Sequence, residues 1–367
     1  MKTIAITGLL SPLGRDLGRL AGQFGLRVLG IDMKPLTRPF PGVEFVEADL
    51  RNPLIGELFK AEKVDTIVHC AFRWRRHHIE EVFDSNVMGT MRMLGAAALA
   101  GVRKVIFPSS TLVYGARPDN PAFLKETSDF RGRPAYAYIR ELREIETFIS
   151  GFRRQYPAMT VTVLRFAHIL GGAPVYPLAR WLSLPMAPVL LGFEPMIQVI
   201  DYEDVLRALG HSILEDHNGA YNIAADPPLP LLKVLALAQV PPLPLFHPLA
   251  YRLSNGRLPY RASQLTPLPW DYLRYGCIGD TRRMREAFEF TPAVDAETTV
   301  RRFGQALHEH RYKTHQAYRF MRDGMRAGLE IAHHGLETAR EFARRSEAAL
   351  SSLRQPATAR VNSDQVV

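Results

Sequence analysis

The chain has 367 residues, of which 47% are hydrophobic and 23% charged, and this composition excludes a protein that is disordered throughout. Its two cysteines, Cys70 and Cys277, exclude a disulfide framework and a zinc site built mainly from cysteine. The net charge of +9 is compatible with a phosphate-bearing ligand or an anionic membrane. The sequence contains no zinc finger, basic zipper or RNA-binding motif, so we expect no nucleic-acid partner.

The first 170 residues alternate between short apolar runs and longer helical patterns. Apolar runs without strict alternation are typical of strands that are buried on both faces, as in a parallel sheet covered by helices. The order of strands and helices therefore predicts an α/β fold with a doubly wound, Rossmann-like parallel sheet. The predicted strands are Lys2–Thr7, Arg27–Ile31, Glu44–Val46, Thr66–Cys70, Lys104–Pro108 and Thr160–Arg165, and the predicted helices include Leu13–Phe24, Val82–Ala100 and Ala135–Phe152.

The first strand runs into a turn that contains Gly8, Ser11 and Gly14, and a predicted helix follows. Glycines at such a turn let the backbone approach a pyrophosphate, and the N-terminus of the helix supplies free N–H groups. Asp32 stands at the end of the second strand, where a carboxylate binds the ribose hydroxyls of adenosine and repels a 2′-phosphate. The pattern favours NAD over NADP as the cofactor. A turn with a purely structural role is the alternative.

The character of the sequence changes at about residue 171, where prolines become frequent, and they are densest over 227–269. A further strand is predicted over Gly219–Ala224. The expected organisation is a dinucleotide-binding domain over 1–170 joined again by 199–225, a substrate lobe over 171–198 and 226–300, a basic helical tail over 301–354, and a frayed terminus over 355–367.

The lobe is apolar, but it contains no predicted membrane span. Its longest apolar stretch, Leu229–Tyr251, includes Lys233 and five prolines, which break a continuous helix. Charged residues follow the first apolar run of the chain too closely for a secretory signal, so we expect a cytoplasmic protein. The apolar segments of the lobe either form its own core, line a substrate pocket or touch a membrane surface.

The predicted tail carries eleven basic and six acidic residues over 301–354. Small and apolar residues recur at intervals of four and three from Met325 to Leu353, and this spacing gives a helix one narrow seam. Three interpretations stay open for the seam. It docks on the body of the protein, pairs with a partner helix as in a homodimer, or lies on an anionic membrane.

Beyond the glycine turn, the chain carries motifs at Asp49-Leu50, Val68–Ala71, Asn86–Thr90, Ser109–Gly115, Leu164-Arg165, Asp201–Val205, Gly219–Ile223 and Asp280–Pro292. In this order they resemble the extended short-chain dehydrogenases/reductases, in particular the NAD-dependent sugar epimerase/dehydratase group. The resemblance covers roughly residues 1–300. It implies an NAD-dependent oxidoreductase or epimerase that acts on a secondary alcohol or ketone. A nucleotide sugar is the first substrate class, and the apolar lobe suggests a hydroxylated lipid or sterol as the second.

The resemblance also implies catalytic roles for Ser110, Tyr136 and Asn86, with Arg140 at the position of the family's lysine. A tyrosine exchanges a proton near neutral pH only if a nearby positive charge lowers its pKa. Arginine keeps that charge, but it is bulkier than lysine and not interchangeable with it. A non-catalytic protein that binds NAD(H) as a sensor or scaffold is therefore the alternative.

By the same resemblance, Ser11 replaces the middle glycine of the family's turn. Arg73, in the basic loop after the fourth strand, and Thr111 and His168 are candidates for contact with a small-molecule substrate. A solvated loop and a structural histidine are the alternatives there, and no metal site is predicted. The implied cofactor-binding residues are Thr7, Gly8, Ser11, Leu13, Gly14, Asp32, Asp49, Leu50, Cys70, Ala71, Tyr136 and Arg140.

Overall fold

The structure, a computed structural model, describes residues 2–38, 40–74, 79–133, 136–246 and 267–313. One compact unit extends to Leu307, and a second begins at His308. The seam expected between Met325 and Leu353 and the terminus over 355–367 lie outside the described residues. The basic loop after the fourth strand is described only up to Trp74.

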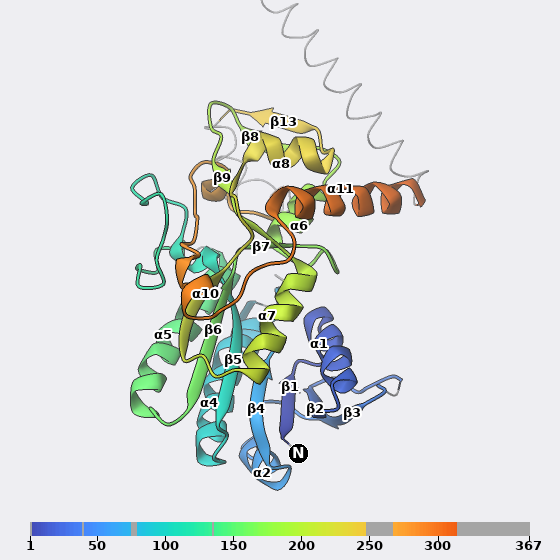
Figure 1. Cartoon of the computed structure of the whole chain (residues 1–367), viewed down its shortest axis with the longest axis vertical. Coiled ribbons are helices and arrows are strands. Elements are labelled where there is room, and N and C mark those ends of the chain that lie inside the picture. The colour runs from blue at the N-terminus through green and yellow to red at the C-terminus, as the bar shows by residue number, and fades with distance from the viewer. Residues whose placement is uncertain (1, 39, 75–78, 134–135, 247–266, 314–367) are drawn as a thin grey trace, which may run out of the picture. The chain divides into compact units, whose positions relative to one another are not determined.

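A parallel sheet of seven strands forms the centre of the first unit (Figure 1). Its order is β11-β6-β5-β4-β1-β2-β3, and every neighbouring pair runs parallel. The order reverses between β1 and β4, and ligands of open α/β sheets bind at the carboxyl ends of the strands beside such a point. The strands are β1 (Thr3–Thr7), β2 (Arg27–Asp32), β3 (Val43–Glu47), β4 (Val64–His69), β5 (Lys104–Ser110), β6 (Thr160–Phe166) and β11 (Gly219–Ile223).

Helices cover both faces of this sheet (Figure 1). In β1, Ile4 and Ile6 pack with Leu17 on one face, whereas Ala5 packs with Phe59 on the other. Burial on both faces explains why the strands read as continuous apolar runs. The predicted α/β, doubly wound fold is therefore confirmed. One face carries α1 (Pro12–Gln23) and α7 (Tyr202–Leu214), and the other carries α2 (Ile55–Ala61), α4 (Gly89–Leu99) and α5 (Ala137–Gln155).

The helix expected over Val82–Ala100 is interrupted. Helix α3 (Ile79–Phe83) passes into a π-helical segment, η1 (Asp84–Met88), and α4 follows directly. The wider turn contains the buried Asn86. Segments of this kind occur frequently at functional sites.

The lobe consists of short strand pairs and short helices. Trp181 and Leu231 are fully buried in the same apolar cluster as the α1 side of the sheet, so the lobe has a packed core. In the described part of the chain, no helix is both long and apolar enough to cross a bilayer. The strand pairs are β7 (His168–Leu170) with β10 (Val199–Asp201), β8 (Ala187–Leu190) with β13 (Pro242–Leu245), and β9 (Met196–Ile197) with β12 (Leu229–Pro230). The remaining elements are η2 (Thr111–Tyr114), α6 (Pro177–Leu182), α8 (Leu231–Ala238), η3 (Trp270–Leu273), α10 (Arg282–Glu286) and α11 (Ala296–Lys313).

Candidate active site

The turn after β1 requires glycine at two positions. Gly8 has a φ of +72°, and a Cβ there would lie 2.4 Å from the Cα of Ala71. A Cβ on Gly14 would lie 2.3 Å from the carbonyl oxygen of Gly8. The backbone of the turn therefore packs directly on the residues after β4 and on the first turn of α1. This close approach is the geometry that a dinucleotide-binding turn uses.

Ser11, which stands where the family has glycine, caps helix α1. Its φ of −66° is open to any residue, so the position does not require glycine. Its Oγ accepts a hydrogen bond from the backbone N–H of Gly14 at 3.0 Å. In the first turn of α1, Pro12 has no N–H, and the N–H groups of Gly14 and Arg15 both bond to Ser11. The N–H of Leu13 makes no hydrogen bond to another described residue. This N–H is a donor for a phosphate oxygen.

The Asp32 carboxylate lies at the end of β2, beside the glycine turn. Its Oδ2 accepts a hydrogen bond from the backbone N–H of Leu10 at 3.0 Å, and its Oδ1 accepts one from the backbone N–H of Lys34 at 3.2 Å. A carboxylate has about four acceptor positions, so capacity remains for ribose hydroxyls. The Lys34 and Arg38 side chains, which lie nearby in the sequence, are exposed.

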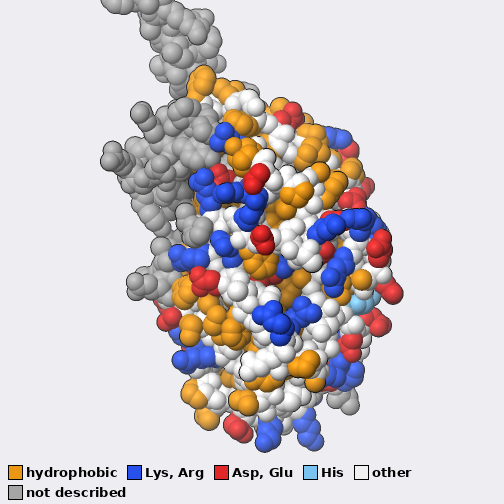
Figure 2. All heavy atoms as spheres, turned by 90° about the vertical axis from the view of Figure 1, so that its left-hand side faces the viewer, with side chains coloured by type: hydrophobic (Ala, Val, Ile, Leu, Met, Phe, Trp, Pro, Cys, Tyr) orange, Lys and Arg blue, Asp and Glu red, His pale blue; other side chains and the backbone are white. Residues whose placement is uncertain are grey.

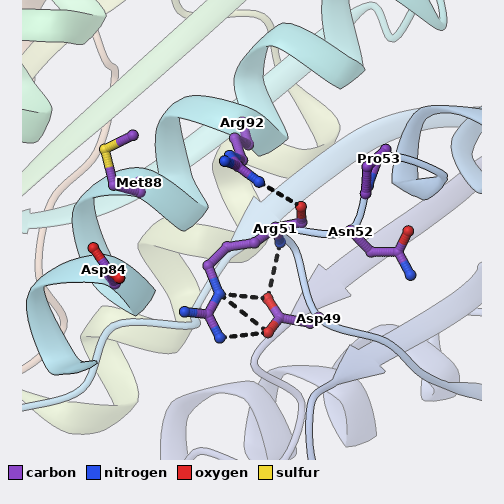
Figure 3. A pocket seen from close by; sticks show the side chains of 7 residues that line it. All are labelled: Asp49, Arg51, Asn52, Pro53, Asp84, Met88 and Arg92. Carbon is purple, nitrogen blue, oxygen red and sulfur yellow. Dashed lines mark hydrogen bonds and ion pairs between the residues drawn. The ribbon is translucent and has the colours of Figure 1, made fainter.

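Asp49 is held by Arg51. The Nε and Nη2 atoms of Arg51 donate to the two carboxylate oxygens of Asp49 at 3.0 and 2.6 Å, and this pairing lowers the pKa of the carboxyl. The pair lines a cavity of about 580 Å³. Figure 3 shows Asp84 and Met88 on the opposite side of this cavity. The neighbouring Leu50 packs against the core beneath. An adenine that reached Asp49 would therefore meet a carboxylate that already has a partner.

A buried hydrogen-bonded chain fixes the ends of β1 and β4. The Thr7 hydroxyl lies 2.7 Å from Nδ1 of His69, whose Nε2 lies 2.8 Å from the Thr90 hydroxyl. Burial lowers the pKa of His69 to about 4 and raises that of the Cys70 thiol to about 12. Both groups are therefore neutral near pH 7. Thr7 and Cys70 are joined at the ends of these strands by a backbone hydrogen bond of 2.9 Å, and Ala71 packs directly against Gly8.

Ser110 and Tyr136 lie at the same carboxyl edge of the sheet. Ser110 is the last residue of β5 and caps η2. The chain then returns along η2, where the N–H of Gly132 donates to the carbonyl of Val113 at 3.1 Å, and it reaches Tyr136 at the start of α5. The topology thus brings both proposed catalytic residues to one end of the sheet.

Tyr136 precedes helix α5. It is the N-cap, with extended backbone angles of φ −96° and ψ 106°, and its carbonyl accepts hydrogen bonds from the N–H groups of Ile139 and Arg140, both at 3.0 Å. Tyr138, in contrast, lies in the first turn of the helix and is 7% exposed. Four residues further along stands the buried Leu142, which has no charge to offer a tyrosine.

The Arg140 guanidinium lies 5.8 Å from the centre of the Phe83 ring, at the end of α3. A cation over an aromatic face is held in place while its charge is retained. Arg140 therefore provides a fixed positive charge near the start of α5, as the resemblance requires of this position.

Asn86, predicted to be catalytic, makes hydrogen bonds to the backbone of Arg73 and to the carboxylate of Glu141. Its Oδ1 accepts from the N–H of Arg73 at 2.9 Å, and its Nδ2 donates to the carbonyl of Arg73 at 3.1 Å and to Oε2 of Glu141 at 2.7 Å. Both amide hydrogens and the oxygen thus have partners. Glu141 is 1% exposed, and burial raises its pKa. Asn86 therefore ties the segment after β4 to α5.

Trp74 lies where these segments meet. Its ring centre is 5.0 Å from that of Phe72 and 5.7 Å from those of Tyr138 and Tyr176. The side chain of Arg73, one residue earlier, is 39% exposed and lies 3.6 Å from the Glu81 carboxylate. An aromatic group thus borders the space between the glycine turn and α5.

The two other substrate candidates take different places. Thr111 is buried in the first turn after β5, and its carbonyl accepts a hydrogen bond from the Cys277 thiol at 3.4 Å. His168 begins β7, and desolvation lowers its pKa to about 4 although the residue is part-exposed. A neutral His168 at the lobe boundary is compatible with the structural interpretation.

A buried polar network explains three of the sequence motifs. Arg165 forms an ion pair with Glu146 at 2.7 Å, and both side chains are at most 5% exposed. Its Nη1 also donates to the Tyr114 hydroxyl at 2.7 Å, and that hydroxyl donates to Oδ1 of Asn222 at 2.7 Å. Burial raises the pKa of Tyr114 above its usual range. Tyr114, Arg165 and Asn222, one residue from each of the Ser109–Gly115, Leu164-Arg165 and Gly219–Ile223 motifs, are therefore structural here, which their spacing along the chain did not reveal.

Comparison with known proteins adds a family and a set of similar folds. The model of the NAD dependent epimerase/dehydratase family matches residues 4–224. An uncharacterised protein of Mycobacterium tuberculosis is 31% identical over 312 residues, 82% of each chain. The solved structure of MoeE5 with UDP-glucuronic acid and NAD is similar with a TM-score of 0.64 at 19% identity, covering 84% of this chain and 99% of that one. The UDP-glucose 4-epimerase of Thermotoga maritima with UDP-glucose gives 0.63 at 17% identity, with coverages of 84% and 99%.

Proposed function

The chain belongs to the NAD-dependent epimerase/dehydratase family, and on that basis we propose that it is an NAD-dependent oxidoreductase or epimerase. Its substrate carries a secondary alcohol or a ketone. The observation that carries the proposal is the glycine turn, in which Gly8 and Gly14 permit no side chain and Asp32 stands beside the turn. These features are the ones that a protein needs to bind the family's cofactor, NAD.

When bound, NAD would supply the acceptor or donor of the hydride that leaves or returns to the substrate carbon. The residues of the turn fit this cofactor, because the Leu13 N–H offers a donor to a phosphate oxygen and Asp32 retains acceptors for ribose hydroxyls. Thr7, Cys70 and Ala71 support the turn from β1 and β4.

Proton transfer is assigned to Tyr136, with the Ser110 hydroxyl holding the substrate oxygen and Arg140 supplying the positive charge that favours a tyrosinate. Asn86 acts as a positioning residue, since its amide holds the backbone of Arg73.

A nucleotide sugar is the first substrate class, supported by the UDP-sugars named in the titles of the similar structures. A hydroxylated lipid or sterol is the second. Four large apolar side chains of the lobe favour it, because they are 40 to 70% exposed and suited to apolar contact: Leu191, Met196, Leu232 and Phe246.

A non-catalytic NAD(H) sensor or scaffold is the competing function. It is favoured by Arg140, which stands where the family has lysine. In either case we propose a cytoplasmic protein that contacts a membrane surface through its apolar lobe or its basic tail, or forms a homodimer.

The test combines cofactor retention with turnover. Native mass spectrometry of the purified full chain is expected to show one bound NAD(H), and NADH oxidation is expected against a panel of 4-keto sugars and other ketones. Retained NAD with no activity on any substrate would favour the sensor. No retained NAD and no measurable affinity for NADH would refute both functions.

A further inference from the structure

Two arginines converge over the first residue of β11, at the amino end of the sheet. Gly219 has a φ of +136°, and a Cβ there would lie 2.8 Å from Nη2 of Arg283 and 3.8 Å from Nη2 of Arg153. One guanidinium comes from the last turn of α5 and the other from α10. Glycine at this position therefore leaves the guanidinium groups room to approach the same point of the backbone.

Hydrogen bonds hold the Arg153 side chain in place. Its Nε donates to Oδ1 of Asn218 at 3.0 Å, and the same oxygen accepts the N–H of Val161, in β6, at 3.3 Å. The residue before β11 thus ties the guanidinium to the sheet through one nitrogen. The other two nitrogens of Arg153 make no hydrogen bond to a described residue, so their donors are available to a ligand.

Arg283 is held by an aromatic ring. Its guanidinium carbon lies 4.9 Å from the centre of the Tyr221 ring, and that ring lies 5.0 Å from the ring of the fully buried Phe288. A cation over an aromatic face is fixed in position while its charge is retained. No described residue accepts a hydrogen bond from the Arg283 side chain, which is exposed. Both guanidinium groups are therefore ordered before a ligand arrives.

The charges of this arginine pair are not compensated within the described part of the chain. Asp280, which precedes α10, pairs with Arg282 at 2.6 Å, and no carboxylate pairs with Arg153 or Arg283. Burial and the neighbouring charge of Arg283 lower the pKa of Arg153. A guanidinium nevertheless stays protonated in proteins, so the two groups repel each other. An anion bound by both would remove this repulsion.

A phosphate group matches the pair in charge and in shape. A phosphate ester carries a charge of about −2 at neutral pH, and its three acceptor oxygens point in different directions. Guanidinium groups that come from two elements can therefore each donate to separate oxygens, whereas a carboxylate offers only two oxygens in one plane. We propose that Arg153 and Arg283 bind the phosphate group of a small molecule at the amino end of β11.

This site is separate from the candidate active site. The glycine turn, Ser110 and Tyr136 lie at the carboxyl end of the sheet, whereas Gly219 is the first residue of its strand. The ligand is therefore not the substrate, and the proposal goes beyond the proposed function because it requires neither bound NAD nor turnover. Figure 2 views the side on which Figure 1 shows α5 and α10, and groups of Lys and Arg side chains are exposed there among apolar ones.

The test is calorimetric titration of the full chain with inorganic phosphate, in the presence of excess NADH so that the glycine turn is not the site observed. Arg153→Gln and Arg283→Gln are each expected to weaken phosphate binding at least about tenfold, because each removes one charged donor group. Arg301→Gln, which removes an exposed arginine of α11, is the matched control and is expected to bind like wild type.

Arg283→Gln keeps the test decisive if Arg153→Gln fails to fold, because Arg283 is exposed. The proposal is overturned if wild type binds no phosphate at millimolar concentration, or if Arg283→Gln binds phosphate as tightly as wild type. Titration of wild type and the variants with NADH alone tests the proposed function separately. A chain that binds phosphate through these arginines but has no affinity for NADH would refute the proposed function and support this site.

A second titration separates two sources of the phosphate, the free ion and a phosphorylated metabolite. Glycerol 3-phosphate is the probe for the second source. If it binds more tightly than inorganic phosphate and loses this affinity in Arg283→Gln, the ligand is a phosphate ester. If inorganic phosphate binds at least as tightly, the ligand is the free ion. Both results support the site, and both are obtained from binding alone.

Discussion

At the scale of single residues, Asp32 controls the choice of cofactor. Its carboxylate lies beside the glycine turn, where a 2′-phosphate would meet a like charge. We expect NADH to bind at least about tenfold more tightly than NADPH, a difference of roughly 1.4 kcal/mol. Asp32→Asn removes the charge and keeps an acceptor for the Leu10 N–H, so it is expected to bring the two affinities closer. Calorimetry with both cofactors measures the ratio.

Equal affinity of wild type for the two cofactors would contradict this role. Recruitment of the exposed Lys34 or Arg38 to the phosphate would then be the physical cause. Lys34→Ala and Arg38→Ala would identify it by lowering NADPH affinity alone.

Tyr136 and Arg140 decide whether the protein is an enzyme. Tyr136→Phe is expected to abolish turnover and leave NADH affinity nearly unchanged, because only the proton-transfer group is lost. Arg140→Ala is expected to weaken both. Arg140→Lys is expected to lower activity in a site adapted to the arginine fork. NADH oxidation against the ketone panel and NADH titration measure these effects.

The matched control is Tyr138→Phe, which removes the hydroxyl of the tyrosine in the first turn of α5. If this variant is inactive and Tyr136→Phe is active, the proton-transfer group is Tyr138. If wild type is inert and Arg140→Lys gains activity, the sensor or scaffold function replaces the enzyme.

The sequence carries more information about the geometry of the turn than about the contacts around α5. Gly8, Gly14 and Asp32 act through local backbone geometry and short-range contacts, so their spacing carries the information. The partners of Asn86 are Arg73 and Glu141, 13 and 55 residues away in sequence. Such pairings depend on how elements meet in space, and no local pattern reports them.

At the scale of elements, Lys104 anchors helix α7 to the sheet. Its side chain is fully buried at the start of β5, and its Nζ donates to the carbonyls of Ser212, Ile213 and Glu215 at 2.8 to 3.2 Å. Two of these carbonyls belong to the last turn of α7. Carbonyls at the end of a helix have no N–H group of a following turn to bond to. The ammonium therefore replaces the missing donors and complements the negative end of the helix.

Lys104→Met is expected to lower the free energy of unfolding by about 2–4 kcal/mol, because it leaves these carbonyls without their charged donor, whereas Asp216 keeps its ion pair with Arg103. Urea denaturation at pH 7 measures the change. Lys60→Met, at an exposed position of α2, is the control and is expected to change stability by less than about 0.5 kcal/mol. A similar small effect at position 104 would show that the anchor contributes nothing.

The main strands were predictable to within about two residues, because burial on both faces gives each an apolar run. The break at Asp84–Met88 was not, since a π-helical turn keeps nearly the same apolar pattern as an α-helix. The short strand pairs of the lobe also escaped prediction. Segments such as Pro242–Leu245 pair through only a few residues and are set by packing rather than by periodicity.

At the scale of the whole molecule, buried histidines make stability dependent on pH. His69 is 2% exposed, and burial lowers its pKa to about 4, whereas an unfolded histidine titrates near 6.5. Between these values the unfolded chain binds a proton that the folded chain does not, so stability present above pH 6.5 is lost as the pH falls toward 4. Desolvation lowers the pKa of His168 and His217 as well, in the same direction.

We expect the free energy of unfolding to fall by roughly 3 kcal/mol for His69 alone between pH 7.5 and 4. Urea denaturation across this range measures the slope. His69→Gln is expected to reduce the slope, and His308→Gln, at an exposed position, is expected to leave it unchanged. A stability that is flat over the range would contradict the neutral, buried state of His69.

The tail is expected to be dispensable for cofactor binding, because every residue assigned to the cofactor lies before residue 141. The structure sets where the cut must fall. Val300 is fully buried, and a Cβ on Gly304 would lie 2.6 Å from the Cα of Ala238, so the start of α11 packs against the end of α8. Removal of everything after about residue 300 would strip this packing, whereas a cut after Lys313 retains it.

Truncation after Lys313 is therefore expected to leave NADH affinity unchanged and to alter either the oligomeric mass or the binding to anionic vesicles. Calorimetry, light scattering and vesicle sedimentation measure the three properties on the full and truncated chains. An unchanged mass with unchanged vesicle binding would mean that the seam docks on the protein's own body, since the other two uses of a narrow apolar seam each predict a loss. A fall in NADH affinity beyond about threefold, or roughly 0.7 kcal/mol, would contradict the independence of the cofactor site from the tail.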